Sequence, residues 1–339
     1  MSAGTQVASE TVLRVTDLEK TYRPRGIGGL GRQGVRAVAG VSFELRRGET
    51  LAVVGESGCG KSSVANAVLQ LDPPTGGKVE FLGRDLATLS QRQLSGVRRE
   101  LQVVFQDPYA SLNNRMRVGQ LVAEPLHIHH RSMPAKERLA RVKDVLDKVG
   151  LRDIDLDRYP QSFSGGQRQR LGIARAIIVD PTVVVCDEAV SALDVSVQAQ
   201  VLNLLADLQR DHRLAYLFIT HDLGVVRQIA DRVAVMYLGR FVEVGDAGEV
   251  FENPRHPYTR ALLDAVPGQG RTERFEASGD VPDPRAIPSG CPFHPRCPAR
   301  REELCDTDRP ALDELGDTGR LVACHYPLPL ADAEVNGAR

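Results

Sequence analysis

The stretch GESGCGKS, Gly55 to Ser62, constrains the fold of this chain more than any other part of its sequence. It has the spacing G-x-x-x-x-G-K-S/T and follows the apolar run TLAVV, while the run after it, KSSVANAVLQL, has apolar residues at helical spacing. A strand, a glycine loop and a helix in this order point backbone N–H groups and a helix N-terminus at a bound phosphate. Lys61 adds a cation, and the Ser62 hydroxyl suits Mg²⁺.

The alternative to this interpretation is a simple glycine-rich turn. The glycine spacing, the lysine, the hydroxyl and both flanks all favour the phosphate site instead. The residues of this loop and of the helix start that are predicted to bind the nucleotide are Gly55, Ser57, Gly58, Cys59, Gly60, Lys61, Ser62 and Ser63.

A second stretch, VVVCDE at Val183 to Glu188, ends an apolar strand pattern with two carboxylates. Parallel sheets bind ligands at the carboxyl ends of their strands. Asp187 is therefore predicted to hold Mg²⁺ directly or through water, and Glu188 to orient or deprotonate an attacking water molecule. The alternative is that both are ordinary solvated acids at a strand end.

Short apolar strands alternate with helical patterns along most of the chain. The strand patterns TLAVV, LQVVFQ, TVVVCD, LAYLFIT and RVAVMYL are separated by helical stretches, which is typical of a largely parallel sheet covered by helices. Residues from about 107 to 180 are rich in helical patterns and are interpreted as a helical insertion. The sequence predicts an α/β fold with a P-loop nucleoside-triphosphatase core and a mixed, largely parallel sheet.

Composition narrows the class of protein further. The 339 residues carry a formal net charge of −1, so no overall charge favours nucleic acid or an acidic membrane surface. The first residues lack the order of charged, apolar and small residues found in a secretory signal, and no apolar run approaches the ~20 residues of a membrane helix. We therefore expect a cytoplasmic chain that reaches a membrane only through partners.

The stretch FSGGQRQR, Phe163 to Arg170, lies between the two nucleotide motifs. Ser164, Gly165 and Gly166 open a predicted helix, so a hydroxyl, bare N–H groups and the helix dipole would together form an anion receptor. A simple N-cap would require only the serine. With Gln167 included, the stretch resembles the LSGGQ signature of the ATP-binding cassette (ABC) family, with Phe in place of Leu.

The resemblance to the ABC family implies an ATPase that forms a head-to-tail dimer with a second homologous ATPase subunit. ATP would lie between the phosphate loop of one subunit and Ser164 to Gln167 of the other. Tyr22 matches the aromatic residue that stacks on adenine, although simple packing is an alternative for it. Gln106 matches the catalytic Q-loop glutamine that senses Mg²⁺ and water, Asp194 the loop that crosses the dimer, and His221 the switch histidine that contacts the γ-phosphate.

A closer resemblance covers almost the whole chain. FQDPYASLNNRM (Phe105 to Met116) and ENPRHPYTRALLDAVP (Glu252 to Pro267) resemble segments of the ATPase subunits of bacterial oligopeptide and dipeptide importers. This implies an ATP-hydrolysing motor at the cytoplasmic face of the membrane that drives uptake of oligopeptides or dipeptides. The implied partners are two membrane permease subunits, a second ATPase subunit and an external solute-binding protein. Nickel or another solute is the alternative cargo.

Four of the six cysteines lie near the end of the chain, at Cys291, Cys297, Cys305 and Cys324. They are separated by five, seven and eighteen residues, which is wider than the pairs of ordinary zinc modules. Some peptide-importer ATPases carry a [4Fe-4S] cluster in a stretch that this one resembles. Tetrahedral Zn²⁺ and reduced, unliganded thiols are the alternatives. Either metal would stabilise a segment with few apolar residues.

Three parts are therefore expected along the chain. A nucleotide-binding domain at 11–266 contains the helical subdomain at about 107–180, a small Cys-rich domain follows at 267–330, and a tail occupies 331–339. The loop-rich composition after residue 266 is the reason for placing a boundary there.

Two functions from other classes are also considered. A soluble ABC ATPase of DNA repair or translation is the first, but this sequence lacks the long coiled-coil insertion or second cassette typical of those proteins. A nucleic-acid contact by the Arg-rich CPARREE is the second. Glu302 and Glu303 in the same stretch favour a solvated surface, so no nucleic-acid partner is expected.

Overall fold

The computed structural model describes residues 10–23, 34–266 and 275–330. The chain divides into two compact units. Of the described residues, the first unit comprises 10–15, 43–50 and 78–218, and the second comprises 16–23, 34–42, 51–77, 219–266 and 275–330. The predicted tail at 331–339 and the predicted domain boundary at residue 267 lie outside the described residues.

A buried parallel sheet forms the centre of the first unit. β6 (Leu101–Val104) and β7 (Val183–Asp187) run parallel, and β8 (Ala215–Ile219) is the next neighbour of β7. β7 has the sequence VVVCD, and its first four residues are buried. Such β-branched runs suit a strand that is covered on both faces. The carboxyl end of β7 therefore presents Asp187 and Glu188.

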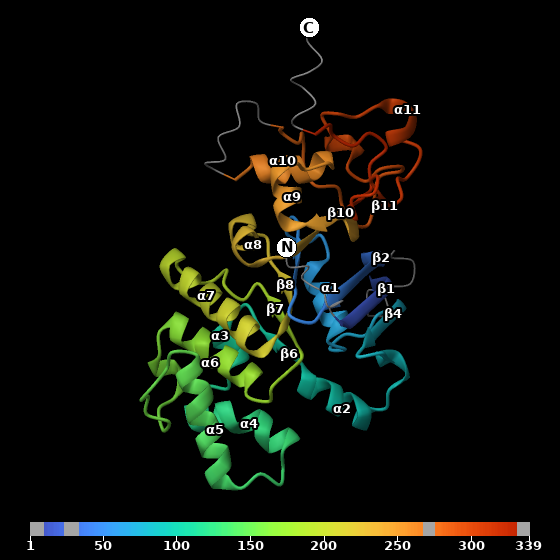
Figure 1. Cartoon of the computed structure of the whole chain (residues 1–339). Coiled ribbons are helices and arrows are strands. Elements are labelled where there is room, and N and C mark those ends of the chain that lie inside the picture. The colour runs from blue at the N-terminus through green and yellow to red at the C-terminus, as the bar shows by residue number, and fades with distance from the viewer. Residues whose placement is uncertain (1–9, 24–33, 267–274, 331–339) are drawn as a thin grey trace, which may run out of the picture. The chain divides into compact units, whose positions relative to one another are not determined.

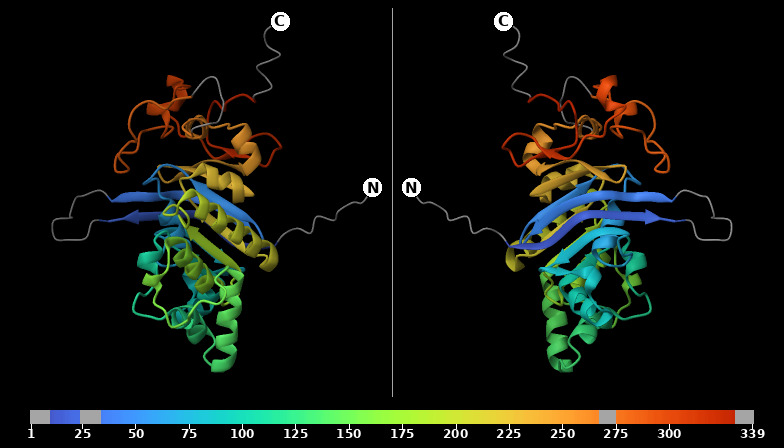
Figure 2. Two further views of the ribbon diagram at one scale, coloured as in Figure 1. Left: turned by 90° about the vertical axis from the view of Figure 1, so that its left-hand side faces the viewer. Right: turned by 90° about the vertical axis from the view of Figure 1, so that its right-hand side faces the viewer.

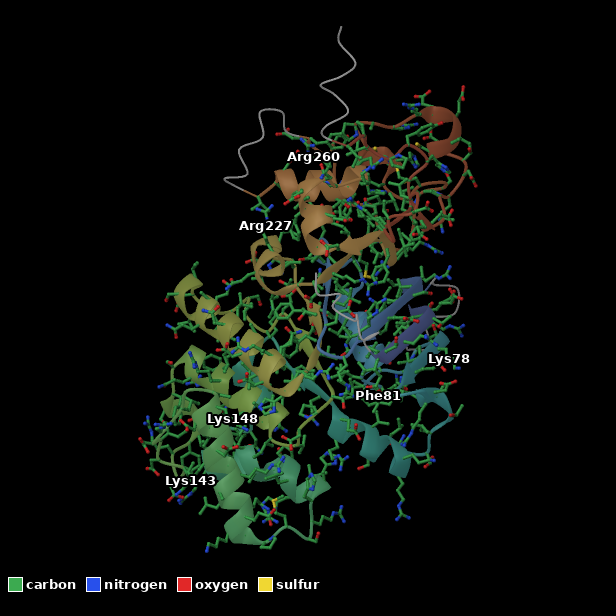
Figure 3. All side chains as sticks on the ribbon, in the orientation of Figure 1. Lys78, Phe81, Lys143, Lys148, Arg227 and Arg260 are labelled. Atoms are coloured by element: carbon green, nitrogen blue, oxygen red, sulfur yellow. The ribbon has the colours of Figure 1, made fainter. Side chains whose placement is uncertain are left out.

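Between β6 and β7 the chain is mostly helical. α4 packs against both α5 and α6 (Figure 1). On α5 the buried residues Val142, Val145 and Leu146 recur at helical spacing, whereas Lys143 and Lys148 are exposed (Figure 3). Within the described ranges, every helix is too short or too polar to cross a lipid bilayer. The helices of this unit are η1 (Leu86–Thr88), α2 (Gln91–Glu100), α3 (Pro108–Ser111), α4 (Val118–His129), α5 (Ala135–Lys148), η2 (Pro160–Ser162), α6 (Gly165–Ile177) and α7 (Val195–His212).

The second unit contains a mixed sheet in the order β11-β12-β10-β9-β3. β3 runs parallel to β9, and the pairs from β9 through β10 and β12 to β11 are antiparallel. The bounds of these strands are β3 (Thr50–Val54), β9 (Arg232–Tyr237), β10 (Arg240–Asp246), β11 (Asp313–Glu314) and β12 (Leu321–Val322). The helices are α1 (Lys61–Val68), α8 (Leu223–Ile229), α9 (Ala247–Glu252), α10 (Pro257–Asp264), η3 (His294–Arg296) and α11 (Glu302–Cys305).

Two long neighbouring strands, β1 (Thr11–Tyr22) and β2 (Val35–Arg46), lie side by side (Figure 2). β4 (Gly76–Phe81) is antiparallel to the short β5 (Arg84–Asp85). β1 ends at Tyr22, the residue predicted to contact the adenine.

The C-terminal segment, residues 275–330, shares its apolar core with the strands of the second unit. Cys291 and Phe293 belong to one hydrophobic cluster with Tyr237 of β9 and Tyr258 of α10. β12 of the segment pairs with β10. The prediction of a separate small Cys-rich domain is therefore not confirmed, because the few apolar side chains of this segment pack into a core that other parts of the chain supply.

A buried ion pair also ties the C-terminal segment to β10. Glu243 is fully buried and Arg320 is 5% exposed. The Arg320 guanidinium donates from Nε to Glu243 Oε1 at 3.0 Å and also to the carbonyl oxygen of Asn253. The Glu243 carboxylate accepts the backbone N–H groups of Arg255 and His256 as well, at 2.8 and 3.0 Å. Every carboxylate oxygen of Glu243 therefore has a donor, as a buried charge requires.

Candidate functional site

The phosphate loop adopts a conformation that only glycine permits at two positions. Gly60 has φ +113°, and a Cβ atom there would lie 2.1 Å from the carbonyl oxygen of Ala37. Gly55 has φ +153°, and its Cβ atom would lie 2.2 Å from the carbonyl oxygen of Met236. The loop is therefore held in shape by close backbone contacts, as expected of a glycine-rich phosphate loop.

Lys61 begins α1 and lies across the phosphate loop. Its Nζ donates to the carbonyl oxygens of Gly55 at 2.8 Å and Glu56 at 3.1 Å, and the side chain is buried. Gly60, the N-cap of α1, has no side chain to cap the first N–H groups of the helix. A cation and uncapped helix N–H groups at one place fit a bound phosphate group. Burial raises the pKa of the neighbouring Cys59 thiol, so this thiol stays protonated and packs as an apolar group.

Tyr22 lies next to the phosphate loop. Its hydroxyl donates to Ser63 Oγ at 3.3 Å, and the residue as a whole is 39% exposed. Lys20 Nζ lies 5.3 Å from the ring centroid. The structure thus brings two predicted nucleotide-binding residues together, with an accessible aromatic face beside them.

Gln106 and Glu188 come together in the first unit. Gln106 Nε2 donates to Glu188 Oε2 at 2.8 Å and to Ser191 Oγ at 3.3 Å. Glu188 follows Asp187 at the end of β7 and has φ +48°, a left-handed conformation that non-glycine residues seldom adopt. Strained residues of this kind concentrate at functional sites. The backbone geometry aims the Glu188 carboxylate at the glutamine.

Ser164 is the N-cap of α6, as the FSGGQ stretch predicts. Its Oγ accepts the N–H of Gln167 at 3.3 Å, and Gln167 Oε1 accepts the N–H of Ser164 at 3.0 Å, which completes a capping box. A Cβ atom at Gly166 would lie 2.4 Å from Val197 Cγ1. A side chain on the second glycine would therefore collide with Val197 of α7.

Asp194 is the N-cap of α7. It accepts the N–H of Val197 at 2.9 Å and the hydroxyl of Ser196 at 2.7 Å. These hydrogen bonds, the backbone one first, hold the pKa of the Asp194 carboxyl below its usual value. The next residue, Val195, is 82% exposed, so this turn presents a charge and an apolar side chain at the surface.

The predicted site residues are divided between the two units. Tyr22, Gly55 to Ser63 and His221 lie in the second unit, and His221 is an exposed residue between β8 and α8. The others lie in the first unit, namely Gln106, Ser164, Gly165, Gly166, Gln167, Asp187, Glu188 and Asp194. The roles assigned to all of them remain predictions.

The four C-terminal cysteines share one neighbourhood. The N–H of Cys291 donates to the carbonyl oxygen of Cys305 at 2.8 Å. Burial raises the pKa of Cys297 to about 11 and that of Cys324 to about 12, and the nearby thiols add to both shifts. Within the described ranges, however, no group of three or more His, Cys, Asp or Glu side chains is arranged to hold a metal ion. The expected cluster therefore gains no support from the geometry.

Sequence reasoning missed two residues that contact the phosphate loop. The Tyr258 hydroxyl accepts the N–H of Glu56 at 3.0 Å, and the Arg296 guanidinium binds the Glu56 carboxylate. Tyr258 lies in the ENPRHPYTRALLDAVP stretch, which the sequence analysis used only as a resemblance to peptide-importer ATPase subunits. Arg296 lies between two cysteines and carried no signal of its own.

A glycine loop with a buried lysine ahead of a helix, together with a strand that ends in Asp-Glu, defines a P-loop ATPase. Comparison with known proteins agrees. A family model described as ABC transporter matches residues 38–191, and one described as oligopeptide/dipeptide transporter, C-terminal region, matches residues 242–305.

Two relatives are similar over most of the chain. The di/tripeptide transport ATP-binding protein DppF of Pseudomonas aeruginosa (strain UCBPP-PA14) is 49% identical over 94% of this chain and 98% of its own length. The oligopeptide transport ATP-binding protein OppF of Escherichia coli (strain K12) is 50% identical over 87% of this chain and 89% of its own length. The chain therefore belongs to the family of ABC transporter ATP-binding proteins of the oligopeptide and dipeptide type, which confirms the resemblance seen in the sequence.

Solved structures show the same fold. CbiO1 of Clostridium perfringens, described as part of an ABC transporter complex, has a TM-score of 0.62 and 27% identity, covering 71% of this chain and 91% of its own. A dimeric ATP-binding cassette described as a post-hydrolysis state bound to ADP and Pi has a TM-score of 0.61 and 27% identity, covering 69% of this chain and 98% of its own.

Proposed function

We propose that this chain is the ATP-hydrolysing subunit of an importer that takes up dipeptides or oligopeptides. The observation that carries the catalytic part is the hydrogen bond from Gln106 to the strained Glu188 at the end of β7. The cargo follows from the peptide-transport relatives, which match nearly the full chain. Transport of nickel or another solute is the alternative, and a DNA-repair or translation ATPase is not favoured by these relatives.

In this proposal the phosphate loop and Tyr22 bind ATP, with Tyr22 against the adenine. Ser62, Gln106 and Asp187 are the residues that would hold Mg²⁺, which would neutralise charge on the phosphate groups. Glu188 accepts a proton from the attacking water, and Gln106 orients both that water and the Glu188 carboxylate. His221 contacts the γ-phosphate. Placement and neutralisation of charge supply most of the rate, because phosphoryl transfer needs little covalent help.

The proposed assembly is a head-to-tail pair of ATPase subunits. Ser164 to Gln167 of one subunit would bind the γ-phosphate held by the other, and Asp194 would cross between them. The pair would bind two permease subunits at the cytoplasmic face of the membrane, with an external solute-binding protein delivering the peptide.

The substitution Glu188→Gln tests the catalytic part. We expect ATP binding to be kept and steady-state turnover to fall ~10²-fold or more, the usual scale for a lost general base. The trapped ATP complex should also form stable dimers, measurable by light scattering. Glu137→Gln, an exposed acid in the first turn of α5, is the matched control. Normal turnover in the Glu188 variant would remove this residue from the role.

The cargo is tested with the permeases and a solute-binding protein in lipid nanodiscs. ATPase turnover should rise with a peptide-loaded binding protein and stay unchanged with nickel. Stimulation by nickel alone would replace the peptide proposal.

For the cysteines we propose a metal centre with Cys291, Cys297, Cys305 and Cys324 as ligands, an iron–sulfur cluster before Zn²⁺. The support is chemical. Four thiols lie in one partly buried segment, and nearby thiols help to raise the pKa of Cys297 and of Cys324. Protein purified without oxygen is tested by visible absorbance and by iron, sulfide and zinc analysis. If iron, sulfide and zinc are all absent, the four cysteines are reduced thiols without a metal.

A further inference from the structure

Glu56, the second residue of the phosphate loop, is held from two directions by the second unit. Its backbone N–H donates to the Tyr258 hydroxyl at 3.0 Å. Its carboxylate accepts two hydrogen bonds from Arg296, at 2.9 Å from Nη1 and 3.1 Å from Nη2. Tyr258 is 202 and Arg296 is 240 residues away along the chain. A planar, two-point guanidinium–carboxylate pair is among the strongest side-chain contacts in proteins.

Arg296 also contacts other parts of the second unit besides Glu56. It ends η3, its own N–H donates to the carbonyl oxygen of Phe293 at 2.9 Å, and it is only 8% exposed. Its guanidinium lies 5.9 Å from the ring centroids of both Tyr237 and Phe293. The hydrogen bonds to Glu56 raise the pKa of this guanidinium further above its ordinary value, so it carries a full positive charge.

Tyr258 belongs to the same aromatic cluster. Its ring centroid lies 4.6 Å from that of Tyr237 and 5.3 Å from that of Phe293. These separations lie within the range that aromatic pairs prefer. The two side chains that bind Glu56 therefore contact the same aromatic cluster in the core of the second unit.

The contacts of Tyr258 and Arg296 with Glu56 bear on nucleotide binding because Glu56 carries a carboxylate. The loop binds an ATP triphosphate, and a carboxylate beside it would repel the phosphate groups through partly buried space, where Coulomb forces are weakly screened. A cavity of about 320 Å³, lined by Glu56, Tyr258 and Arg296, borders the pair.

We propose that Arg296 is a positioning residue for ATP, which acts through Glu56 by cancelling and orienting its carboxylate. The C-terminal segment is then a determinant of nucleotide affinity, in addition to any role of its cysteines. The inference rests on ATP binding by the phosphate loop.

The test compares three variants by titration with a fluorescent ATP analogue and by turnover. Arg296→Ala should weaken nucleotide binding about tenfold, the size of an interaction between charges several ångströms apart at intermediate dielectric. Glu56→Gln leaves Arg296 positive beside the loop, so binding should stay within about twofold of the wild type or become tighter. The double variant should bind within about threefold of Glu56→Gln, since without the carboxylate the arginine has nothing to cancel. In Arg296→Ala the kcat should change less than the KM.

Salt gives a second readout that a purely structural role would not move. The difference between wild type and Arg296→Ala should shrink when KCl is raised from about 50 to about 500 mM, because the repulsion is screened. Arg300→Ala is the matched control. It breaks an ion pair with Asp306 in the same segment, at 2.8 Å from Nε, without touching the loop, and should leave nucleotide binding as it is.

Equal weakening in Arg296→Ala, Glu56→Gln and the double variant would overturn the inference and assign Arg296 a structural role. Wild-type binding in Arg296→Ala would overturn it as well. Failure of the wild type itself to bind nucleotide would instead reject ATP binding by the loop. Thermal unfolding without nucleotide checks that each variant is folded.

Discussion

The phosphate loop and the C-terminal segment are held in place by opposite means. The loop depends on the absence of side chains. A Cβ atom at Gly55 or Gly60 would lie about 2 Å from a backbone carbonyl oxygen. The C-terminal segment depends on side chains, above all the buried pair of Glu243 and Arg320 and the aromatic packing of Phe293. One region is fixed by steric exclusion and the other by charge and ring contacts.

This difference has a physical consequence. Steric exclusion does not change with pH or salt, whereas a structure held by charges responds to both. The two regions meet at Glu56, where a loop fixed by its backbone carries a charge that the C-terminal segment compensates. Substitutions that act on only one of the two mechanisms separate their contributions.

The largest effect is expected from Arg320→Ala. This change leaves the fully buried Glu243 without its charged partner, and breaking a buried ion pair from one side costs about 3–5 kcal/mol of unfolding free energy. Urea unfolding measures it. Arg300→Ala, in an exposed ion pair of the same segment, should change stability far less. Similar losses in both variants would mean that burial is not what makes the Glu243 pair important.

A smaller effect, on nucleotide binding, is expected from Gly60→Ala. The left-handed conformation alone costs an L-residue about 1–2 kcal/mol, and the overlap with the Ala37 carbonyl oxygen adds to it. We expect at least about 30-fold weaker nucleotide binding, measured by titration with a fluorescent analogue. Gly58→Ala is the control, since Gly58 has φ +80° but nothing within 4 Å of its Cβ position, and it should lose about tenfold or less. Equal losses would show that conformation, not steric overlap, governs the loop.

The smallest effect is a pH dependence that originates at His256. Burial lowers the pKa of this histidine to about 3, so it is neutral when folded, and its Nδ1 accepts the N–H of Tyr258 at 3.0 Å. The unfolded chain takes up a proton near pH 6.5, and stability is therefore complete above that pH and is lost as the pH falls toward 3. Between pH 7.5 and 5.0 the loss from this residue should be about 2 kcal/mol.

His256→Asn keeps an N-cap for α10 and removes the titrating group. Urea unfolding at the two pH values should show a loss smaller than in the wild type by about that amount. An unchanged pH dependence would assign the acid sensitivity to other groups.

The sequence predicted the regions whose geometry is local. The glycine spacing around Lys61, the acids after β7 and the serine that caps α6 are all specified within a few neighbouring residues, so pattern and propensity suffice. In the structure the glycine loop precedes α1, Glu188 follows β7 and Ser164 caps α6, as the patterns indicated, whereas the contact of Gln106 with Glu188 was not predicted. Contacts between distant residues left no such trace in the sequence.

The packing of the C-terminal segment could not be predicted from the sequence. Its poverty in apolar residues suggested a domain in need of a metal, because a single sequence does not reveal that Phe293 packs on Tyr237 and Tyr258, some tens of residues earlier. The two-residue strands β11 and β12 are also too short to show an alternating pattern. The contacts of Tyr258 and Arg296 with Glu56 could not be predicted either, because these residues are far apart along the chain.

The pairing of β12 with β10 has one more consequence, for the solubility of the chain. Without Leu321 and Val322, β10 would present a row of unpaired N–H and C=O groups to any other strand nearby. β12 covers that row at Glu243 and Val244. The outermost strand of the described sheet is then β11, which consists of the exposed acidic residues Asp313 and Glu314. Two short strands ending in negative charge are a poor template for further pairing, so the C-terminal segment shields the sheet from self-association.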